Sequence, residues 1–441
     1  MKIAIIGAGW AGMAAAVEAT LAGHNTVVFE ASHAIGGRAK ALNSTLPDGT
    51  PVTLDNGQHI LIGAYTQTLR LMRVVGVDPD TALLRLPLHL RSPDGLGLQF
   101  PAWPTPLDAL AGIVTARGWT VADKWSLLRI AMGWQRRGFQ CDDATSVAQL
   151  CRALPTRVMR AMIEPLCVSA LNTPASQASG QVFLRVMQDA LFGAARGSNL
   201  LLPRIDLSAL FPNAAARWLA LRGAQIRVGT RVASVMQQGA QWQVNGECFD
   251  TVIFATSASE SIRSLDSTAQ EATDSIAKKI HAWTQITRTL QFEAITTLYA
   301  WGAGAHLADP MLTLRSHAGD TRTAPAPAQF VFDRGQLGGP QGLLAFVVSA
   351  STGDRETLQA QVLIQAQQQL GLNLKAVQTI VEKRATFACT PGLQRPPQCI
   401  TPGLIACADY VAGPYPATLE GAVRSAIAAV KAVTPSREPR P

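Results

Sequence analysis

The residues with the clearest chemical meaning are three closely spaced glycines near the start of the chain. Gly7, Gly9 and Gly12 form a G-x-G-x-x-G pattern in the sequence GAGWAG. In this pattern the first glycine makes a tight turn, the second lets the backbone approach a diphosphate, and the third allows a helix to pack closely on a strand. The free N–H groups at the start of that helix, beside Trp10 and Ala11, favour an anion. The spacing therefore predicts a dinucleotide site.

The elements on either side of the glycines fit this role. The apolar run at residues 2–6 predicts a buried parallel strand, and the Ala-rich run at 11–22 predicts a helix that Gly23 ends. Residues 25–29 predict the next strand, and Glu30 follows at the distance expected of a carboxylate that binds a ribose hydroxyl. A glycine-rich turn without a ligand is the alternative, but the complete strand–turn–helix–strand–acid order disfavours it.

A second glycine loop distinguishes between dinucleotides. Gly36 and Gly37 are adjacent, so the backbone can pass close to a bulky ligand, and Arg38 adds a fixed cation near the phosphates or the flavin edge. A plain nicotinamide dehydrogenase has no evident use for this loop. The pattern favours FAD.

The motifs GAGWAG, FEA and GGR together resemble the flavin-containing amine oxidase and phytoene desaturase superfamily. The resemblance implies an α/β fold, in which a discontinuous Rossmann-type FAD-binding domain carries an inserted α+β substrate domain, as in amine oxidases. Residues 1–75, 203–285 and 385–441 are then expected to form the FAD-binding domain. Residues 76–202 and 286–384 are expected to form the substrate-binding domain, with mostly helix in the first block and strands such as 343–348 in the second.

The end of the chain is expected to return to the cofactor. Residues 404–409 predict a short strand that ends at Asp409, and a helix is predicted to run from about 417 to 433. Asp409 would hydrogen-bond the ribityl or phosphate region of FAD. The helix N-terminus, with Thr418, Leu419 and Ala422, would lie against the flavin ring and stabilise negative charge there. An ordinary strand–helix end with a surface aspartate is the alternative.

Two internal segments are also expected at the cofactor. Residues 224–228, 230–235, 242–244 and 249–255 alternate as strands do. The superfamily resemblance implies that Val232 meets the adenine through its backbone. It also implies that the loop with Gly57, Gln58 and His59 borders the flavin ring.

Five further stretches narrow the resemblance. Residues 55–71, 164–166, 170–174, 198–208 and 419–425 are similar to the squalene-associated FAD-dependent enzymes, the hydroxysqualene dehydroxylases. That similarity implies reductive removal of an allylic hydroxyl from a C30 isoprenoid alcohol to give squalene, a precursor of hopanoids and other triterpenoids. It also implies an external electron donor, which the sequence does not identify, and raises the expectation of association with other squalene-pathway enzymes.

Loss of a hydroxyl group at neutral pH calls for a proton donor. His59 is the first candidate, because an imidazolium is a suitable acid near pH 7. Tyr65 is the second, and Tyr410 and Tyr415 are further alternatives. A packed or surface histidine without a catalytic role remains an open interpretation.

Composition limits the classes of partner. The 441 residues carry a formal net charge of +8, but the basic residues are scattered, which disfavours nucleic-acid binding. Attraction to an anionic membrane and simple solubility both remain open. The segment 100–107, with Trp119, Trp125 and Trp134 near several basic residues, predicts either an interfacial helix or a core tryptophan stripe.

The cysteines, histidines and apolar runs indicate the cellular compartment and whether a metal is bound. Seven cysteines without a Cys-x-x-Cys pair indicate reduced, mostly packed thiols in a cytoplasmic protein, and the seven histidines have no metal-ligand spacing. No apolar run reaches membrane-spanning length and the N-terminus does not resemble a signal peptide. We therefore expect no metal site and a cytoplasmic location, with contact at the inner face of the cytoplasmic membrane as an open extension.

Three other functions stay open on the sequence. An FAD-dependent carotenoid or squalene desaturase would use the same motifs. An amine oxidase is disfavoured, because it needs an aromatic cage and aromatic residues make up 6% of this chain. A non-catalytic FAD-binding partner of lipid-synthesis enzymes belongs to a different class, and its flavin would resist reduction.

Overall fold

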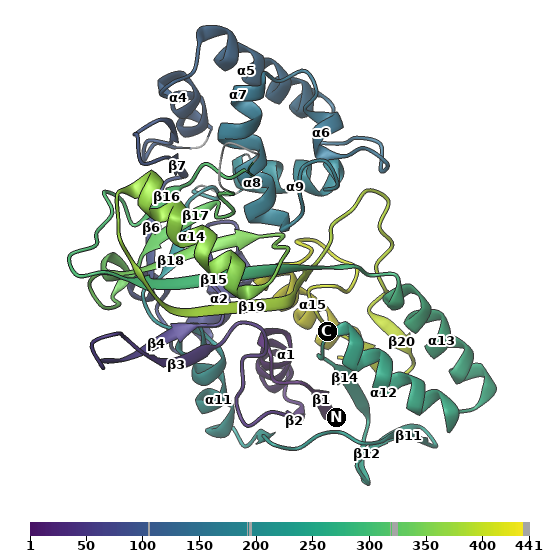
Figure 1. The fold of residues 1–441 in the computed structure, drawn as a ribbon. Coiled ribbons are helices and arrows are strands. Elements are labelled where there is room, and N and C mark those ends of the chain that lie inside the picture. Colours follow the sequence, from purple (N-terminus) through teal and green to yellow (C-terminus); the bar gives the residue numbers. More distant parts are fainter. Residues whose placement is uncertain (105, 192, 194–195, 318, 320–324, 435–441) are drawn as a thin grey trace.

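The computed structural model describes residues 1–441 except 105, 192, 194–195, 318, 320–324 and 435–441. Within these ranges a six-stranded sheet lies at one end of the molecule, a five-stranded sheet lies in the middle, and a group of helices forms the other end (Figure 1). The described part of the chain has no helix that is both long and apolar enough to span a bilayer.

The six-stranded sheet gathers strands from three distant parts of the sequence. In sheet order, among the described residues, they are β10 (Gln225–Arg227), β2 (Asn25–Phe29), β1 (Lys2–Ile6), β14 (Thr251–Phe254), β21 (Leu404–Ala406) and β20 (Cys399–Thr401). All neighbours are parallel except β20, which runs antiparallel to β21. The predicted α/β class and the discontinuous Rossmann-type sheet are confirmed, whereas the domain boundaries stay a prediction.

Both faces of this sheet are buried, which explains its continuous apolar strands. Ile3 and Ile5 pack under α1 (Trp10–Leu21), α11 (Pro212–Ala220) and α15 (Leu419–Val433). Ala4 and Ile6 point the other way, into a cluster that contains residues of α12 (Ala258–Gln270) and of a small antiparallel sheet. That sheet consists of β11 (Val235–Gln238), β12 (Gln241–Val244) and β13 (Glu247–Phe249).

One predicted strand near this sheet is wrong. Residues 230–234 form no strand, because their amides bond elsewhere: Thr230 N–H donates to Glu30 O, and the amides of Ala233 and Ser234 donate to the Asn245 side chain. The segment instead forms an irregular wall beside β2.

The five-stranded sheet is antiparallel throughout. In sheet order its described strands are β16 (Met311–Thr313), β17 (Phe330–Asp333), β18 (Leu343–Ser349), β15 (Phe292–Trp301) and β19 (Lys375–Phe387). Its outer face is covered by α14 (Arg355–Leu370), where Leu358 and Val362 pack against Phe346. The inner face, with Phe330 and Val347, belongs to a different apolar cluster and faces the interior of the molecule.

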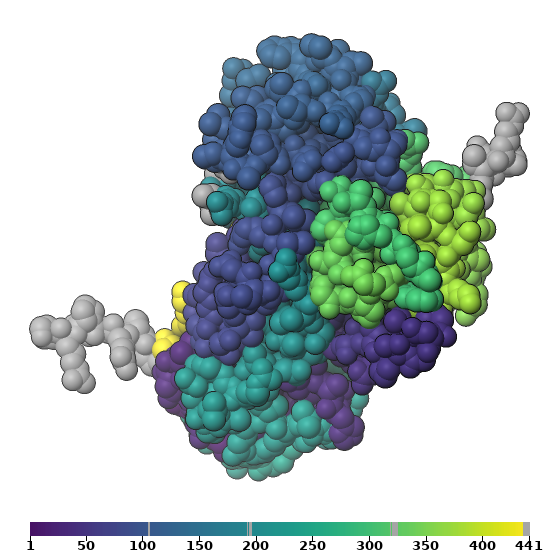
Figure 2. Space-filling model, turned by 90° about the vertical axis from the view of Figure 1, so that its left-hand side faces the viewer, coloured from purple at the N-terminus to yellow at the C-terminus, as the bar shows by residue number. Residues whose placement is uncertain are grey.

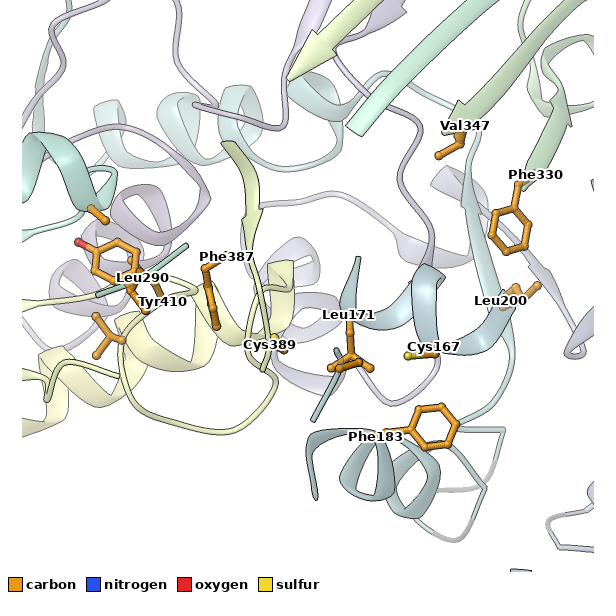
Figure 3. Close-up of a cluster of buried hydrophobic side chains, with 14 of the residues drawn as sticks. Cys167, Leu171, Phe183, Leu200, Leu290, Phe330, Val347, Phe387, Cys389 and Tyr410 are labelled. Atoms are coloured by element: carbon orange, nitrogen blue, oxygen red, sulfur yellow. The ribbon is translucent and has the colours of Figure 1, made fainter. Parts of the chain in front are cut away.

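The helical lobe, residues 107–191, forms the far end of the molecule and is the blue cap in Figure 2. Its helices are α4 (Leu107–Thr115), α5 (Val121–Arg136), α6 (Val147–Leu150), α7 (Thr156–Val158), α8 (Glu164–Leu171) and α9 (Gly180–Leu191), with a π-helical turn at Met159–Ile163. Figure 3 shows how a continuous buried cluster joins this lobe to the sheets, with Cys167, Leu171 and Phe183 near Phe387 and Cys389.

The expectation of mostly helix across residues 76–202 is wrong in part. Leucine-rich stretches there pair as strands, because they meet partners elsewhere in the chain. One small sheet has the strand order β5 (Leu61–Ile62), β9 (Leu200–Pro203), β6 (Leu83–Leu86). A second consists of β7 (His89–Arg91) and β8 (Gly97–Gln99). A third, earlier in the chain, consists of β3 (Ala41–Thr45) and β4 (Pro51–Asp55). The remaining helices are α2 (Thr66–Val74), α3 (Pro79–Ala82), α10 (Leu207–Leu210), α13 (Asp274–Arg288) and a 3₁₀ turn at Arg334–Leu337.

Candidate functional site

A cavity of about 570 Å³ lies between the carboxyl end of the six-stranded sheet and the inner face of the five-stranded sheet. Nearly all of the residues that the sequence predicts at a cofactor lie on its wall. They are Gly7, Gly9, Trp10, Ala11, Glu30, Gly36, Gly37, Arg38, Gly57, Gln58, His59, Tyr65, Val232, Asp409, Thr418, Leu419 and Ala422. Gly12 is not a wall residue.

Glycine occupies the three positions of the first motif for different structural reasons. Gly7 has φ +104°, and a Cβ there would lie 2.7 Å from Ala255 O. A Cβ on Gly12 would lie 1.9 Å from Gly7 O, so this glycine lets α1 pack on the turn. Gly9 has φ −74° and ψ −176°, which any residue adopts, and a Cβ there would meet only Gly37 Cα, at 3.8 Å. A side chain at Gly9 would therefore take up cavity space.

The second glycine loop lies directly on the first. Gly36 N–H donates to Ala8 O at 2.8 Å, and Gly37 has φ +62°. The Glu30 carboxylate fixes the same turn, since it accepts the N–H groups of Ala8 at 2.7 Å and of Ser32 at 2.8 Å. Glu30 still faces the cavity, and its bond to a ribose stays a prediction.

Arg38 joins the two ends of the chain at the cavity wall. Its Nη2 lies 2.5 Å from Asp409 Oδ1, and its Nη1 donates to Ala385 O at 2.7 Å. The charge of Asp409 raises the pKa of Arg38 above its ordinary value, so the guanidinium stays charged. Asp409, predicted to bind the ribityl or phosphate region, thus also holds the arginine of the Gly-Gly-Arg loop in place.

The α15 N-terminus lies close to Asp409, since Ala417 N–H donates to Asp409 O at 3.3 Å. The Thr418 side chain caps the helix by accepting Gly421 N–H at 3.0 Å. Glu420 is fully buried and accepts the amides of Gln67 and Thr68 as well as the Arg424 guanidinium. These bonds tie α15 to α2 and leave the first-turn N–H groups of α15 beside the wall residues Leu419 and Ala422.

The wall fits FAD in three respects. No side chain caps α1, so its first-turn N–H groups remain available to an anion at Gly9, Trp10 and Ala11. The absent Cβ of Gly9 leaves room for a diphosphate, and Arg38 supplies a nearby cation. The residues present therefore fit the cofactor that the sequence predicts.

His59 is the wall residue that was the first candidate acid. Its Nδ1 lies 2.8 Å from Gly57 O, and because a carbonyl oxygen only accepts, Nδ1 carries the hydrogen. Burial lowers the pKa of His59, the Gly57 carbonyl opposes this, and the charge of Arg38 lowers it further. The ring is therefore mostly neutral at pH 7, with the Nε2 lone pair free.

The three tyrosines differ in position. Tyr65 lies on the cavity wall, and burial raises its pKa, so the phenol keeps its proton. Tyr410 does not line the cavity, since its hydroxyl is buried against Ser261 Oγ at 2.9 Å. Tyr415 is not a wall residue either, and its ring packs edge-on against Tyr65, with centroids 6.2 Å apart. The structure thus removes Tyr410 and Tyr415 as groups that face this cavity.

The cavity continues from the glycine motifs into an apolar end. The inner face of the five-stranded sheet contributes Phe330 and Val347, which are cross-strand partners, and Ile295. Val168 of α8 lines the same end. Such a wall suits a hydrocarbon ligand.

Two polar wall residues at this end were not predicted from the sequence. Asn172 ends α8 with φ +46°, accepts Ala350 N–H at 2.7 Å and donates to Thr386 Oγ1 at 3.0 Å, so it fixes α8 to the sheet. Glu382 pairs across strands with Ile295. Among the described residues, it is the one wall carboxylate for which the structure shows neither a hydrogen bond nor an ion pair. The single acid in the run of residues 375–387 is the signal that could have identified it.

Comparisons with known proteins support a flavin cofactor. The family model described as flavin containing amine oxidoreductase matches residues 10–434. The hydroxysqualene dehydroxylase of Zymomonas mobilis is 26% identical over 245 residues, which cover 53% of this chain and 55% of that protein, so the chain spans about half of that relative's length. The hydroxysqualene dehydroxylase of Rhodopseudomonas palustris is 25% identical over 457 residues, covering 96% of this chain and 95% of that protein. A zeta-carotene desaturase of Synechocystis is 39% identical over 89 residues, 20% of this chain and 17% of that protein.

Solved structures share the fold. An oxidoreductase from Methanosarcina mazei superimposes with a TM-score of 0.71 at 14% identity, covering 98% of this chain and 100% of that one. A triple mutant of putrescine oxidase superimposes with a TM-score of 0.69 at 15% identity, covering 98% of each chain. The chain belongs to the flavin-containing amine oxidoreductase family, as an FAD-dependent oxidoreductase that resembles the hydroxysqualene dehydroxylases.

Proposed function

We propose that the protein reduces hydroxysqualene to squalene by removing its allylic hydroxyl group. The observation that carries this proposal is the match to a hydroxysqualene dehydroxylase over 96% of the chain. The apolar end of the cavity supports it, because a C30 hydrocarbon needs a dry, apolar chamber beside the cofactor. Squalene would then pass to the enzymes that consume it, and association with those enzymes is part of the proposal.

The reaction replaces a C–OH bond by a C–H bond, so it consumes one hydride and one proton and releases one water. Reduced flavin, when bound, supplies the hydride, and an external two-electron donor must restore it after each turnover. The residues that would hold the flavin are those of the two glycine loops, Glu30, Arg38, Asp409 and the α15 N-terminus.

The chain must supply or relay the proton, and His59 is the candidate with the best geometry. The Gly57 carbonyl holds the Nδ1 hydrogen, so any proton that His59 delivers leaves from Nε2. Because the pKa of His59 is lowered, only the protonated minority can act as an acid at pH 7. Turnover that depends on His59 should therefore increase as the pH falls.

Tyr65 and Glu382 have roles that do not require proton release. The protonated Tyr65 phenol can donate a hydrogen bond to the substrate hydroxyl and orient it. The Glu382 carboxylate can stabilise positive charge on the carbon that loses the hydroxyl, because it has no ion-pair partner among the described residues, although its charge also acts on Arg38. The apolar side chains Phe330 and Val347 exclude water from this end of the cavity.

A single-turnover experiment tests the proposal. The holoprotein is reduced with dithionite under argon, excess dithionite is removed, and hydroxysqualene is added in detergent micelles. Reoxidation of the flavin with about one squalene per flavin supports the function. Flavin that stays reduced, with hydroxysqualene recovered intact, refutes it.

The desaturase interpretation is retained as a second candidate because of the Synechocystis match, which covers only 89 residues. Its test uses oxidised holoprotein with squalene or phytoene and looks for flavin bleaching and for new double bonds. Bleaching by these hydrocarbons without reoxidation by hydroxysqualene would replace the proposed reduction with desaturation. Flavin that resists dithionite would favour a non-catalytic role.

A further inference from the structure

Exposed apolar side chains are concentrated on one side of the helical lobe. Among the described residues, eight of the fourteen large apolar side chains with high exposure lie between residues 96 and 132. Six of them form what we call the apolar patch: Leu107, Leu110, Val114, Val121, Trp125 and Met132. Val121 is 84% exposed and Trp125 is 61% exposed, although apolar side chains of this size favour burial.

The apolar patch follows the period of two neighbouring helices. The α4 members are spaced three and four residues apart, and the α5 members continue the stripe. On α5, Arg129 lies between Trp125 and Met132, and Arg136 follows Met132. The opposite faces supply the core, where Ile113, Leu127 and Trp134 are buried. Each helix thus has a second apolar face that stays largely exposed in the described chain.

The tryptophans divide between these two faces. Trp119 and Trp134 are buried, so the core interpretation is correct for them. Trp103 and Trp125 are exposed, so the core interpretation is wrong for Trp125 and the interfacial interpretation stays a prediction for both. The sequence pattern contained both kinds of tryptophan.

The patch has a fixed shape. Thr120 and Asp123 form a capping box at the start of α5. Lys124 Nζ donates to Val114 O at 2.6 Å and joins α5 to the end of α4. The two apolar stripes are therefore held in one surface before any partner binds.

Along the segment that carries the patch, residues 96–137, the exposed charges have one sign. Between residues 96 and 137 both acids, Asp108 and Asp123, are buried. The exposed charges of that segment are all cationic in the part that the structure describes, and among them are Arg117, Arg129 and Arg136. Apolar side chains flanked by cations match the interface of an anionic bilayer, which accepts the former among its acyl chains and attracts the latter.

We propose that the apolar patch docks the protein on an anionic lipid bilayer, at the inner face of the cytoplasmic membrane. The helical lobe that carries the patch also supplies Val168, Ser169 and Ala170 of α8 to the cavity wall, and Figure 2 shows this lobe as one end of the molecule. Docking would thus place the apolar end of the cavity toward the phase that dissolves a hydrocarbon substrate. That last step rests on the proposed function, whereas bilayer binding itself does not.

The test is co-sedimentation of the FAD-loaded protein with vesicles of about 70% phosphatidylcholine and 30% phosphatidylglycerol. We expect binding that falls with added salt and that is much weaker on pure phosphatidylcholine. The double variant Val121→Glu/Trp125→Glu should lose at least about tenfold in affinity. Arg129→Gln/Arg136→Gln should bind about 25-fold more weakly, from about fivefold for each cation.

Matched controls occupy other surfaces. Leu221→Glu replaces an apolar side chain that is 85% exposed outside the helical lobe, and Lys278→Gln/Lys279→Gln removes two cations of α13. Both should bind vesicles as the unchanged protein does. Circular dichroism and flavin content establish that each variant is folded.

Three results would overturn the inference: no binding to the anionic vesicles, equal loss in the control variants, or a stable dimer in solution that Val121→Glu/Trp125→Glu dissociates. The last result would assign the patch to a second copy of the chain. Turnover of hydroxysqualene in detergent micelles is measured on the same samples, so failure of docking and failure of the proposed reaction are told apart.

Discussion

Gly9→Ala separates ligand binding from folding at the first glycine motif. The backbone of Gly9, with φ −74° and ψ −176°, suits alanine, and the nearest protein atom to the new methyl would be Gly37 Cα at 3.8 Å. The apoprotein can accommodate this methyl without strain, so its free energy of thermal unfolding should stay within about 0.5 kcal/mol of that of the unchanged protein. The methyl would lie in the space assigned to the diphosphate. Overpacking costs about 1–3 kcal/mol, so FAD should bind about 5- to 150-fold more weakly.

Gly12→Ala should have the opposite signature. Its methyl would lie 1.9 Å from Gly7 O, about 1.5 Å closer than an ordinary contact, and Gly7 O belongs to the backbone of the turn. The turn or α1 must move, which costs about 1–3 kcal/mol or more. At roughly 2.1 cal/mol/K per residue over 441 residues, the unfolding entropy is about 0.9 kcal/mol/K, so the midpoint should fall by about 1–3 °C.

The assay measures both quantities on the same preparations. FAD affinity is obtained from quenching of FAD fluorescence by the apoprotein, and stability from its thermal unfolding by circular dichroism. The reasoning fails if Gly9→Ala binds FAD as tightly as the unchanged protein, because the diphosphate would then lie elsewhere. It also fails if Gly12→Ala leaves the unfolding midpoint unchanged.

Three further changes test the charged groups on the wall. Asp409→Asn keeps the shape of the side chain but removes the charge that faces the half-buried Arg38. The free energy of unfolding of the holoprotein, measured in urea, should therefore fall by about 1–2 kcal/mol. An unchanged urea midpoint would mean that the ion pair contributes nothing to stability. Because burial lowers the pKa of His59, the single-turnover rate should rise as the pH falls and level off below that pKa. The variant His59→Gln should lose this pH dependence. A pH profile that survives the substitution would exclude His59 as the acid. Glu382→Gln should slow the same reaction about tenfold with unchanged flavin content, and an unaltered rate would remove Glu382 from the chemistry.

The parts of the fold that could be predicted are those where backbone geometry dictates residue type. The strands at residues 2–6 and 25–29 match β1 and β2, because a parallel strand buried on both faces needs an unbroken apolar run. The packing role of Gly12 could be predicted from the sequence, because only a hydrogen atom fits between α1 and the turn at this position. The return of the chain end was also predictable, since an apolar run, an acid and a helical run follow one another there and correspond to β21, Asp409 and α15.

The rest depends on tertiary contacts that leave no local pattern. Residues 230–234 alternate as a strand does, yet their amides bond to Asn245 and Glu30, so the alternation reflects a cavity wall. Tyr410 could not be told from Tyr65 by sequence, because its burial depends on Ser261, 149 residues earlier. Glu382 reaches the cavity only because β19 pairs with β15 in one register, in which Glu382 lies opposite Ile295.

The charges of the wall explain why the glycine turn should dominate FAD affinity. Among the described wall residues, three arginines face the cavity, Arg38, Arg231 and Arg263, and so do four carboxylates, those of Glu30, Glu260, Glu382 and Asp409. Each of the three arginines is paired with a carboxylate, as Arg38 is with Asp409. A diphosphate therefore gains little from the summed charge of the wall. The N–H groups at the start of α1, which no side chain caps and which only an unobstructed Gly9 lets a phosphate reach, are therefore expected to contribute more to diphosphate binding than Arg38 does.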